Sequence, residues 1–212
     1  MKRIATDGIT GISLVPGSQE WYWGADYASG DLYEAEELFR SGHPIQKNRL
    51  LLIRYPEGTV YEPVPTKPGQ YLGSPVCRDG QVILLLVDFP KEKIHILAFD
   101  AQTEQTTPLA VLPLSIAEDC YNLMLKAEPL MLTRSAHDNK FQILWPERRD
   151  FVMEDHEFFE CLEGNRMYTS AWYEDPDYRD EVLVRDYETG EVLERIPGVV
   201  WTMPDGRNWL LG

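Results

Sequence analysis

The sequence has little cysteine and no long apolar run. Its 212 residues include three cysteines, and an odd number does not make a disulfide framework, so we expect a reduced, cytoplasmic protein. The longest candidate for a membrane span, Val82 to Val87, has six residues where about 20 are needed. The turn signal Asp7-Gly8 comes before the apolar core of a leader peptide could form. We therefore expect no membrane partner.

Positive charge is also scarce. Lys and Arg total 20 against 35 Asp and Glu, which gives a formal net charge of −15. Such a field repels a phosphate backbone, and no local basic patch interrupts it, so we expect no nucleic-acid partner. The same field attracts a basic protein or a cationic ligand.

What the chain does contain is a repeat. Four times an apolar strand runs into an aromatic residue and then a polar or Pro/Gly turn. The aromatic residues are Tyr55, Phe99, Trp145 and Tyr187, at steps of 44, 46 and 42 residues. A further strand follows each turn and another hairpin precedes it. A period of about 40–50 residues built from short strands is typical of a β-propeller, with one blade per repeat.

Four strands per unit define the extent of each repeat. The units fall at roughly 9–64, 70–112, 121–155 and 157–196, with an unfinished fifth at 199–212. A spare strand at residues 2–6 can complete that fifth unit and remove the open edges. We predict an all-β fold in which 1–212 form one five-bladed propeller domain. An open four-unit β structure or a sandwich remains the alternative, because short, evenly spaced strands do not distinguish them.

Through these strand–aromatic–turn repeats the chain resembles β-propeller repeat proteins over nearly its whole length. The resemblance is architectural. The repeated Gly-His and Trp-Asp signature of the WD class is absent, as is the paired-glycine signature of kelch repeats, so no family's site residues carry over. Propellers in general are rigid platforms for proteins or small ligands, and some are enzymes, so the resemblance does not choose a function.

Residues 29–44 break the period. Asp31 and Glu34 have the spacing of a capping box, Gly42 suits the left-handed position after a helix, and Pro44 stops continuation. We predict a helix of about ten residues inserted in the first unit. Insertions in repeat proteins often lie on the binding face. The alternative is that the helix only covers the first unit.

Aromatic residues gather before this insertion and on the corresponding strand of the fourth unit. Strand alternation places Trp21 and Trp23 on one side and Tyr22 on the other, and at least one set must be core. The excess suits a carbohydrate- or peptide-binding groove. The candidate binding residues are therefore Trp21, Trp23, Asp26, Tyr27, Tyr33, Phe39, His43 and Trp172.

Other reactive residues fit structural roles better. Cys77 and Cys161 each lie three residues before a turn glycine, where other repeats have Leu or Met, so we predict core packing. The acidic loop at 174–181 lacks the glycine of a calcium loop and contains Arg179, so we predict a solvated loop. The cluster Ser135, His137 and Asp138 is predicted to be a hairpin turn. We expect no metal and no cofactor.

Propeller glycosidases need two carboxylates on the innermost strands. We expect those strands at Ile12–Val15, Tyr71–Cys77, Asn122–Lys126, Phe158–Leu162 and Val199–Met203. Their only carboxylate is that of Glu160. The neighbouring acidic residues Asp150, Glu154, Asp155 and Glu157 are predicted to be exposed edge charges.

The sequence thus favours a non-enzymatic binding or scaffold protein. We expect it to engage a protein or a small-molecule ligand through the inserted-helix face or the channel mouth. Whether it is an enzyme stays open, because a propeller-fold hydrolase acting on a glycan or small ester is the first alternative. A further alternative is an acidic inhibitor of a basic protein partner.

Overall fold

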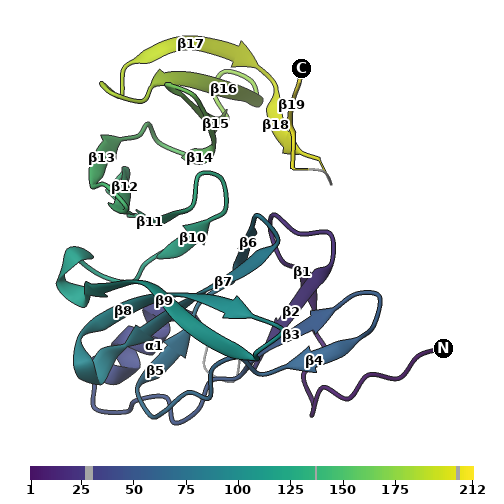
Figure 1. The fold of residues 1–212 in the computed structure, drawn as a ribbon. Helices are drawn as coiled ribbons and strands as arrows, with labels where there is room; N and C mark the ends of the chain where they lie inside the picture. The colour runs from purple at the N-terminus through teal and green to yellow at the C-terminus, as the bar shows by residue number, and fades with distance from the viewer. Residues whose placement is uncertain (27–30, 137, 204–205) are drawn as a thin grey trace. The chain divides into compact units, whose positions relative to one another are not determined.

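The computed structural model describes residues 1–26, 31–136, 138–203 and 206–212 (Figure 1). In these residues the chain is all-β, with 19 strands, one α-helix and two short 3-10 helices. It divides into two compact units, residues 1–134 and 135–212, which are described one at a time.

The first sheet of unit 1 is a four-stranded antiparallel meander. Its order along the chain and in space is β1 (Ser13–Leu14), β2 (Trp21–Ala25), β3 (Leu50–Arg54) and β4 (Thr59–Tyr61). Trp23 pairs with Ser13 on one side and with Leu52 on the other. Four of the five residues of β3 are buried, which explains its continuous apolar run.

The second sheet of unit 1 is built around two long strands. Its strands are β5 (Gln70–Leu72), β6 (Val76–Arg78), β7 (Gln81–Asp88), β8 (Lys93–Asp100) and β9 (Gln105–Pro113). The 3-10 helix η1 (Phe89–Lys91) joins β7 to β8. Both β5 and β6 pair with β7, because residues 73–75 interrupt the single strand predicted for Tyr71–Cys77. Seven of the eight residues of β7 are buried.

Side chains from both sheets of unit 1 form one hydrophobic core cluster. Trp21 lies in it and contacts the rings of Tyr61 and Phe99 at centroid distances of 5.8 and 6.2 Å. The buried members are Val15, Trp21, Leu50, Leu52, Leu72, Cys77, Val82, Leu84, Leu86, Leu97 and Phe99. Trp23 packs against the same cluster while half-buried, which confirms that Trp21 and Trp23 share one side of β2.

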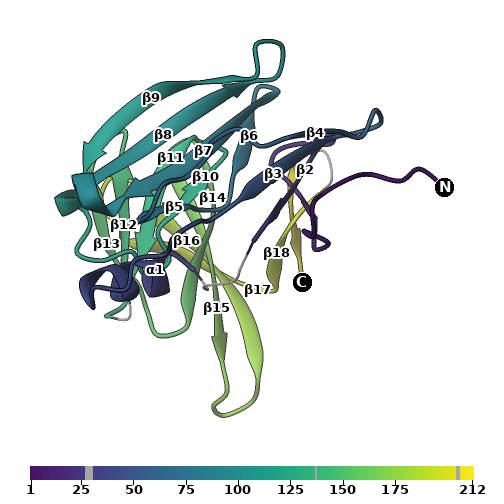
Figure 2. The same ribbon diagram turned by 90° about the horizontal axis from the view of Figure 1, so that it is seen from below.

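The predicted helix is confirmed as α1 (Leu32–Arg40). The Asp31 side chain caps it by accepting a hydrogen bond from the Glu34 N–H at 3.0 Å, and Gly42 has a φ of 81° after its end. The helix lies beside β5 (Figures 1 and 2). Phe39 stacks on Phe89 at 5.5 Å. The insertion therefore packs against elements of the second sheet.

Unit 1 ends with a short connection and a hairpin. They are η2 (Leu114–Ile116), β10 (Met124–Lys126) and β11 (Met131–Ser135), whose last residue begins unit 2. β10 pairs with β11 in antiparallel register. The Arg134 guanidinium is buried and forms an ion pair with Asp119 at 2.8 Å, which fixes the connection against the hairpin.

Unit 2 contains the remaining strands. They are β12 (Lys140–Trp145), β13 (Arg149–Val152), β14 (Glu157–Glu163), β15 (Arg166–Tyr173), β16 (Arg179–Asp186), β17 (Val192–Pro197), β18 (Val199–Thr202) and β19 (Asn208–Leu211). β12 pairs with β13, β14 to β17 form a four-stranded meander, and β18 pairs with β19. Phe141 stacks face to face on Phe159 at 4.8 Å within this unit.

The predicted repeat is visible in the hairpins. Each strand–aromatic–turn–strand segment forms one, as β3–β4, β8–β9, β12–β13 and β16–β17. The predicted closing strand at residues 2–6 is not formed, β18–β19 stays two-stranded, and no closed sheet exists among the described residues. Ile4 is the one large apolar side chain in that segment, so burial does little to hold it as a strand.

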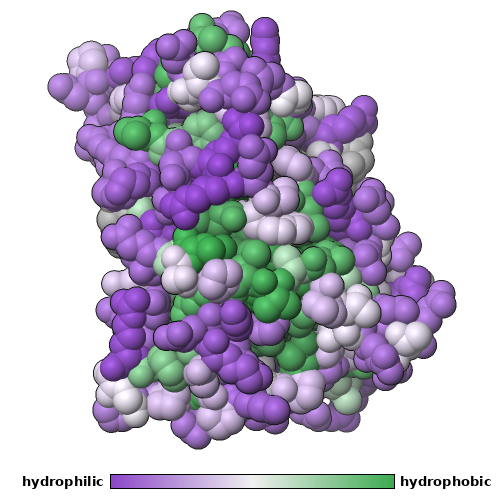
Figure 3. All heavy atoms as spheres, turned by 60° about the vertical axis from the view of Figure 1, so that its left-hand side comes forward, coloured by the Kyte–Doolittle hydropathy of each residue, from purple (hydrophilic) through white to green (hydrophobic). Residues whose placement is uncertain are grey.

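Figure 3 colours one face of the molecule by hydropathy. Hydrophilic residues cover much of this face, and hydrophobic residues gather across its middle. Among the helices of the described residues, none has the length and hydropathy needed to cross a membrane.

Candidate functional site

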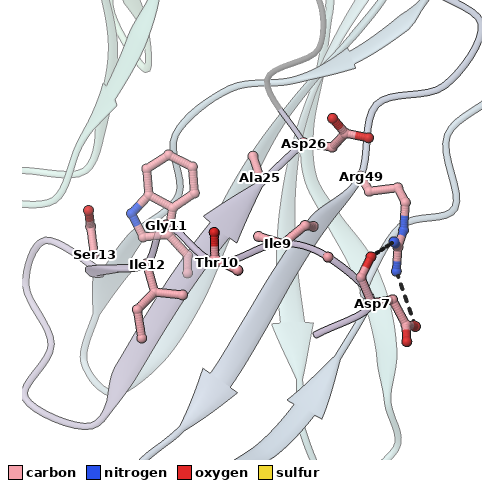
Figure 4. Close-up of a pocket in the computed structure, with 12 residues that line it drawn as sticks. Asp7, Ile9, Thr10, Gly11, Ile12, Ser13, Ala25, Asp26 and Arg49 are labelled. Atoms are coloured by element: carbon pink, nitrogen blue, oxygen red, sulfur yellow. Dashed lines mark hydrogen bonds and ion pairs between the residues drawn. The ribbon is translucent and has the colours of Figure 1, made fainter. Parts of the chain in front are cut away.

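A pocket of about 530 Å³ opens beside β2 in unit 1 (Figure 4). Two continuous segments of the chain line it, together with one residue that directly precedes β3. The lining residues are 7–13, 23–26 and Arg49, and we call this pocket the N-terminal groove. Volumes of about 300–1,000 Å³ are typical of ligand sites.

Gly24 explains how the groove is built. A Cβ at this position would lie 2.6 Å from the Gly11 carbonyl oxygen and 2.9 Å from Cγ2 of Ile9. The absence of a side chain therefore lets the segment before β1 lie directly against β2. Ile9 is buried there, and the Asp26 N–H donates to the Arg49 carbonyl at 2.9 Å. The walls of the groove are held by backbone contacts.

Arg49 organises the charges of the groove. Its Nε and Nη2 donate to Glu62 at 3.2 and 3.0 Å, and its Nη2 lies 3.7 Å from the Asp7 carboxylate. Figure 4 shows the guanidinium reaching toward Asp7. The hydrogen bond to Glu62 raises the pKa of Arg49 against the opposing effect of burial, and the charges of Asp7 and Asp26 add to the rise. Three carboxylates therefore act on one guanidinium.

The groove also has an apolar part. Ile12 lines it with half of its surface exposed, 50%. Trp23 lines it too, although the same side chain packs on the core cluster. The groove thus combines an aromatic and aliphatic wall with an acidic end.

Two of the predicted binding residues, Trp23 and Asp26, meet in this groove. Trp21 does not: it is 6% exposed, in the core. Strand alternation put both tryptophans on one side of β2, but only the end of β2 near Trp21 is covered by Tyr61 and Phe99. The prediction that Trp21 is a binding residue is therefore corrected: Trp21 is a core residue.

The predicted residues of the insertion have different surroundings. The half-buried ring of Tyr33 packs edge-on against Tyr121 at 5.6 Å, and Phe39 stacks on Phe89. His43 is exposed after the helix. Tyr27 lies outside the described residues. On its inner side α1 buries Leu32, Ala35 and Glu36, and the Glu36 carboxylate accepts the Cys120 N–H at 2.7 Å.

Trp172 belongs to unit 2, on β15. It is half-buried and stacks on the ring of His156 at 3.9 Å. Within unit 2 a second pocket, of about 230 Å³, is lined by residues of β14 to β19 that include Arg166, Tyr168 and Trp209, and Trp172 is not among them. The structure therefore does not bring Trp172 into a described pocket.

The acidic residues around β14 correct one prediction. Glu160 is exposed, as are Asp150 and Asp155. Glu157 was expected to be exposed but is 8% exposed, because it alternates with outward-facing Phe158 and so points inward. Glu154 is half-buried. Burial raises its pKa, but hydrogen bonds from Arg195 and Tyr173 outweigh burial and lower the pKa overall.

Cys77 and Cys161 are core residues, as predicted, and Cys120 is a core residue as well. All three are free and buried. Burial raises the pKa of each thiol, that of Cys161 to about 11. In the part of the chain that the structure describes, no three His, Cys, Asp or Glu residues are placed to hold a metal ion. His137 of the predicted turn lies outside the described residues.

Residues 174–178 of the predicted acidic loop are exposed, as predicted, whereas residues 179–181 belong to strand β16. Arg179 donates to the Asp175 carbonyl and to the Glu181 carboxylate, both at 2.9 Å, so two oxygens of this segment already have a cationic partner.

The residues that sequence reasoning missed are Arg49 and the segment 7–13. Their role depends on the close approach to Gly24, which is set by contacts far apart in sequence. A local signal did exist, since Gly8 and Gly11 leave this segment with little bulk.

Comparison with known proteins gives no family. No family model matches the chain, and no curated protein matches it. Dihydro-heme d1 dehydrogenase NirN in complex with DHE is similar over 92% of this chain and 39% of that chain, at 15% identity and a TM-score of 0.47. Kuenenia stuttgartiensis hydrazine synthase is similar over 97% and 56%, at 13% identity and a TM-score of 0.45. The chain thus spans well under two thirds of either structure, and likeness at this level says nothing of its activity.

Proposed function

We propose that this chain is a binding protein and that the N-terminal groove is its ligand site. The observation that carries the proposal is the meeting of Trp23, Asp26 and Arg49 around a pocket of about 530 Å³. An aromatic side chain supplies apolar contact area, and charged groups fix the orientation of a ligand. A small molecule or an exposed segment of a protein fits this description.

Rigid walls support the proposal. Trp23 and Ala25 lie on β2, which pairs with β1 on one side and with β3 on the other. The segment opposite them is held against Gly24. A preformed site loses less conformational entropy on binding than a flexible one. We therefore expect little rearrangement of the backbone around the groove on binding.

We also propose that the repeated sheets are the blades of a five-bladed propeller. In that arrangement β1 is an innermost strand and the groove lies at the channel mouth. The four predicted hairpins support it. Residues 2–6 form no strand in the structure, so the last blade is left two-stranded and we expect these amides to exchange with solvent at the rate of an open chain. Protection of these amides to the same degree as amides of β18 would instead show that they complete the last blade.

The binding proposal is tested by filling the groove. Thr10 lines it with an exposed side chain, so Thr10→Trp should block it without entering the core. Thr107→Trp is the matched control, since Thr107 is exposed on β9 of the same unit. A library of small neutral and charged compounds would be added to the wild-type protein, and binding would be detected by NMR as changes in the backbone amide chemical shifts.

The expected result is a set of compounds that shift amides of residues 7–13 and 23–26. Thr10→Trp should abolish these shifts and Thr107→Trp should leave them unchanged. Compounds that instead gather at α1, at Trp172 or in the pocket of unit 2 would contradict the assignment of the site. Equal binding by both variants would contradict it too.

A further inference from the structure

We infer that β19 is the strand through which two copies of this chain associate. In this dimer the β18–β19 hairpins of the two copies join edge to edge across a twofold axis and form one four-stranded antiparallel sheet. The association concerns unit 2 alone and is independent of the N-terminal groove.

The first observation is that the hairpin is the smallest sheet of the described residues. It has two strands, whereas each of the other sheets has four or five. A hairpin of two strands is marginally stable in water by itself, and further strands stabilise it. Residues 2–6 form no strand that supplies them. A second copy of the hairpin brings two strands and completes a sheet of four.

The second observation is the open edge of β19. Its residues Trp209, Leu210 and Leu211 are 50, 46 and 46% exposed. At the turn of the hairpin, the Met203 N–H donates to the Arg207 carbonyl at 2.8 Å. Hydrogen-bonded pairs alternate along an antiparallel ladder, so the N–H and C=O of Leu210 point away from β18. No strand of the described residues pairs with β19 on that side.

The third observation is that β19 lacks the protection of the other outer strands. Edge strands are guarded against pairing by short length, charged residues, proline or bulges. β4 has three residues, and the longer outer strands contain Pro108 in β9, Arg149 and Asp150 in β13, and Glu194 and Arg195 in β17. β19 reads Asn-Trp-Leu-Leu, without charge, proline or bulge. Its edge is therefore open to pairing with another chain.

The charges select a second copy as the occupant of this edge. Each copy has a net charge of −15, so two copies repel each other where their charged surfaces meet. β18 and β19 contain no charged residue, which makes their edge a place of small repulsion.

The edge is also self-complementary. A twofold axis places a strand antiparallel to its own copy, and with Leu210 on the axis the outward N–H and C=O of both copies pair. Trp209 then lies opposite Leu211 of the partner subunit, so apolar side chains meet along the seam.

Sedimentation velocity of the full chain measures the association. Strands of four residues make a small interface, so we expect a monomer–dimer equilibrium with a dissociation constant on the order of 100 μM. Raised salt should tighten it, because screening weakens the repulsion between the copies. The amide shifts that change with protein concentration should gather at residues 199–202 and 208–212. A chain that stays monomeric at about 1 mM would overturn the inference.

A charge placed on the seam tests the edge itself. Leu211→Glu should weaken the association about tenfold or more, because it opposes a carboxylate to the apolar side chains of the partner subunit. Leu211 does not line the pocket of unit 2, so the hairpin should stay folded. Leu193→Glu is the matched control, since Leu193 is a 56% exposed leucine on β17 of the same unit. Equal weakening by both variants would overturn the assignment to β19.

A cysteine on the twofold axis gives a second test. The Cα atoms of a hydrogen-bonded antiparallel pair lie about 5.5 Å apart, a separation that a disulfide bridges. Leu210→Cys should therefore form a covalent dimer when oxidised glutathione is added as the oxidant, whereas Leu193→Cys should not. The three native cysteines are buried and should not contribute. Equal cross-linking of the two variants would overturn pairing at β19.

Other occupants of the edge give other results. Protected amides at residues 2–6 in a monomeric protein would assign the edge to the chain's own N-terminal segment and would overturn the dimer. Concentration-dependent shifts that lie outside the hairpin would overturn it too, because the copies would then meet elsewhere.

Discussion

Glu157 and Arg185 form a buried, bidentate ion pair inside unit 2. Arg185 Nη2 lies 2.6 Å from Glu157 Oε2, and Arg185 Nε lies 2.7 Å from Oε1. The two side chains are 0% and 6% exposed. The carboxylate also accepts the Thr169 hydroxyl and the Glu154 N–H, while Arg185 Nη1 donates to the Gly190 carbonyl. The pair therefore ties β14, β15, β16 and a turn together.

We expect Glu157→Gln to lower the free energy of unfolding by about 3–5 kcal/mol, because it leaves the Arg185 charge buried without a counter-charge. Glu160→Gln is the control on the same strand, where the side chain is exposed, and it should change stability by less than about 0.5 kcal/mol. Urea unfolding at pH 7 measures both. Equal midpoints for the two variants would show that the ion pair contributes nothing.

The ion pair also shows which features a sequence reveals. Helix α1 was predictable because its cap is local: Asp31 accepts from Glu34, three residues away. The burial of Glu157 was not predictable, since its partner Arg185 is 28 residues away on another strand. A glutamate next to Phe158 and Phe159 gave no local sign of which side of β14 faces inward.

Only part of the groove could be predicted, because local patterns mark some of its residues and contacts distant in sequence determine the others. Alternation along β2 placed Trp21 and Trp23 on one side, and this is confirmed. Which of them stays accessible depends on Tyr61 and Phe99, which come from other strands. Arg49 enters the site through contacts with Glu62 and Asp7, and no pattern in the sequence around Arg49 marks these contacts.

The thiols provide a second prediction. Burial raises the pKa of Cys77, Cys120 and Cys161, the last to about 11. At pH 8 only about one Cys161 in a thousand is then a thiolate, and the thiolate is the reactive form. We expect native protein to react with a thiol reagent such as dithiobis(nitrobenzoate) far more slowly than urea-unfolded protein.

An introduced cysteine supplies the control for that experiment. Thr107→Cys places a thiol on an exposed position of β9, and this thiol should react at the rate of a free cysteine. Native wild-type protein reacting as fast as the variant would contradict the burial of the three thiols.

Asp119 supplies a pH-dependent prediction. The hydrogen bond from Arg134 lowers the pKa of its carboxylate, and burial opposes this effect. A lowered pKa in the folded state stabilises the protein above the unfolded pKa of about 4, and this stabilisation is lost as the pH falls through the folded value. We expect Asp119→Asn to be less stable than the wild type at pH 7.

The size of that difference should depend on pH. Protonated aspartate resembles asparagine in shape and charge, so the gap in unfolding free energy should shrink as the pH falls from 5 to about 2. Urea unfolding of both proteins across this range measures the gap. A gap that stays constant would mean that the Arg134 interaction does not depend on the Asp119 charge.

Gly24 gives the last prediction, because the groove depends on its missing side chain. A Cβ there would lie 2.6 Å from the Gly11 oxygen, which is backbone and cannot turn aside. Gly24→Ala should therefore destabilise the protein by about 1–3 kcal/mol and shift the amides of residues 9–12. Gly11→Ala is the control, since a Cβ at Gly11 has nothing within 4 Å. If both variants kept wild-type stability and amide shifts, the N-terminal segment would not lie against β2 in solution, and the groove would lose one of its walls.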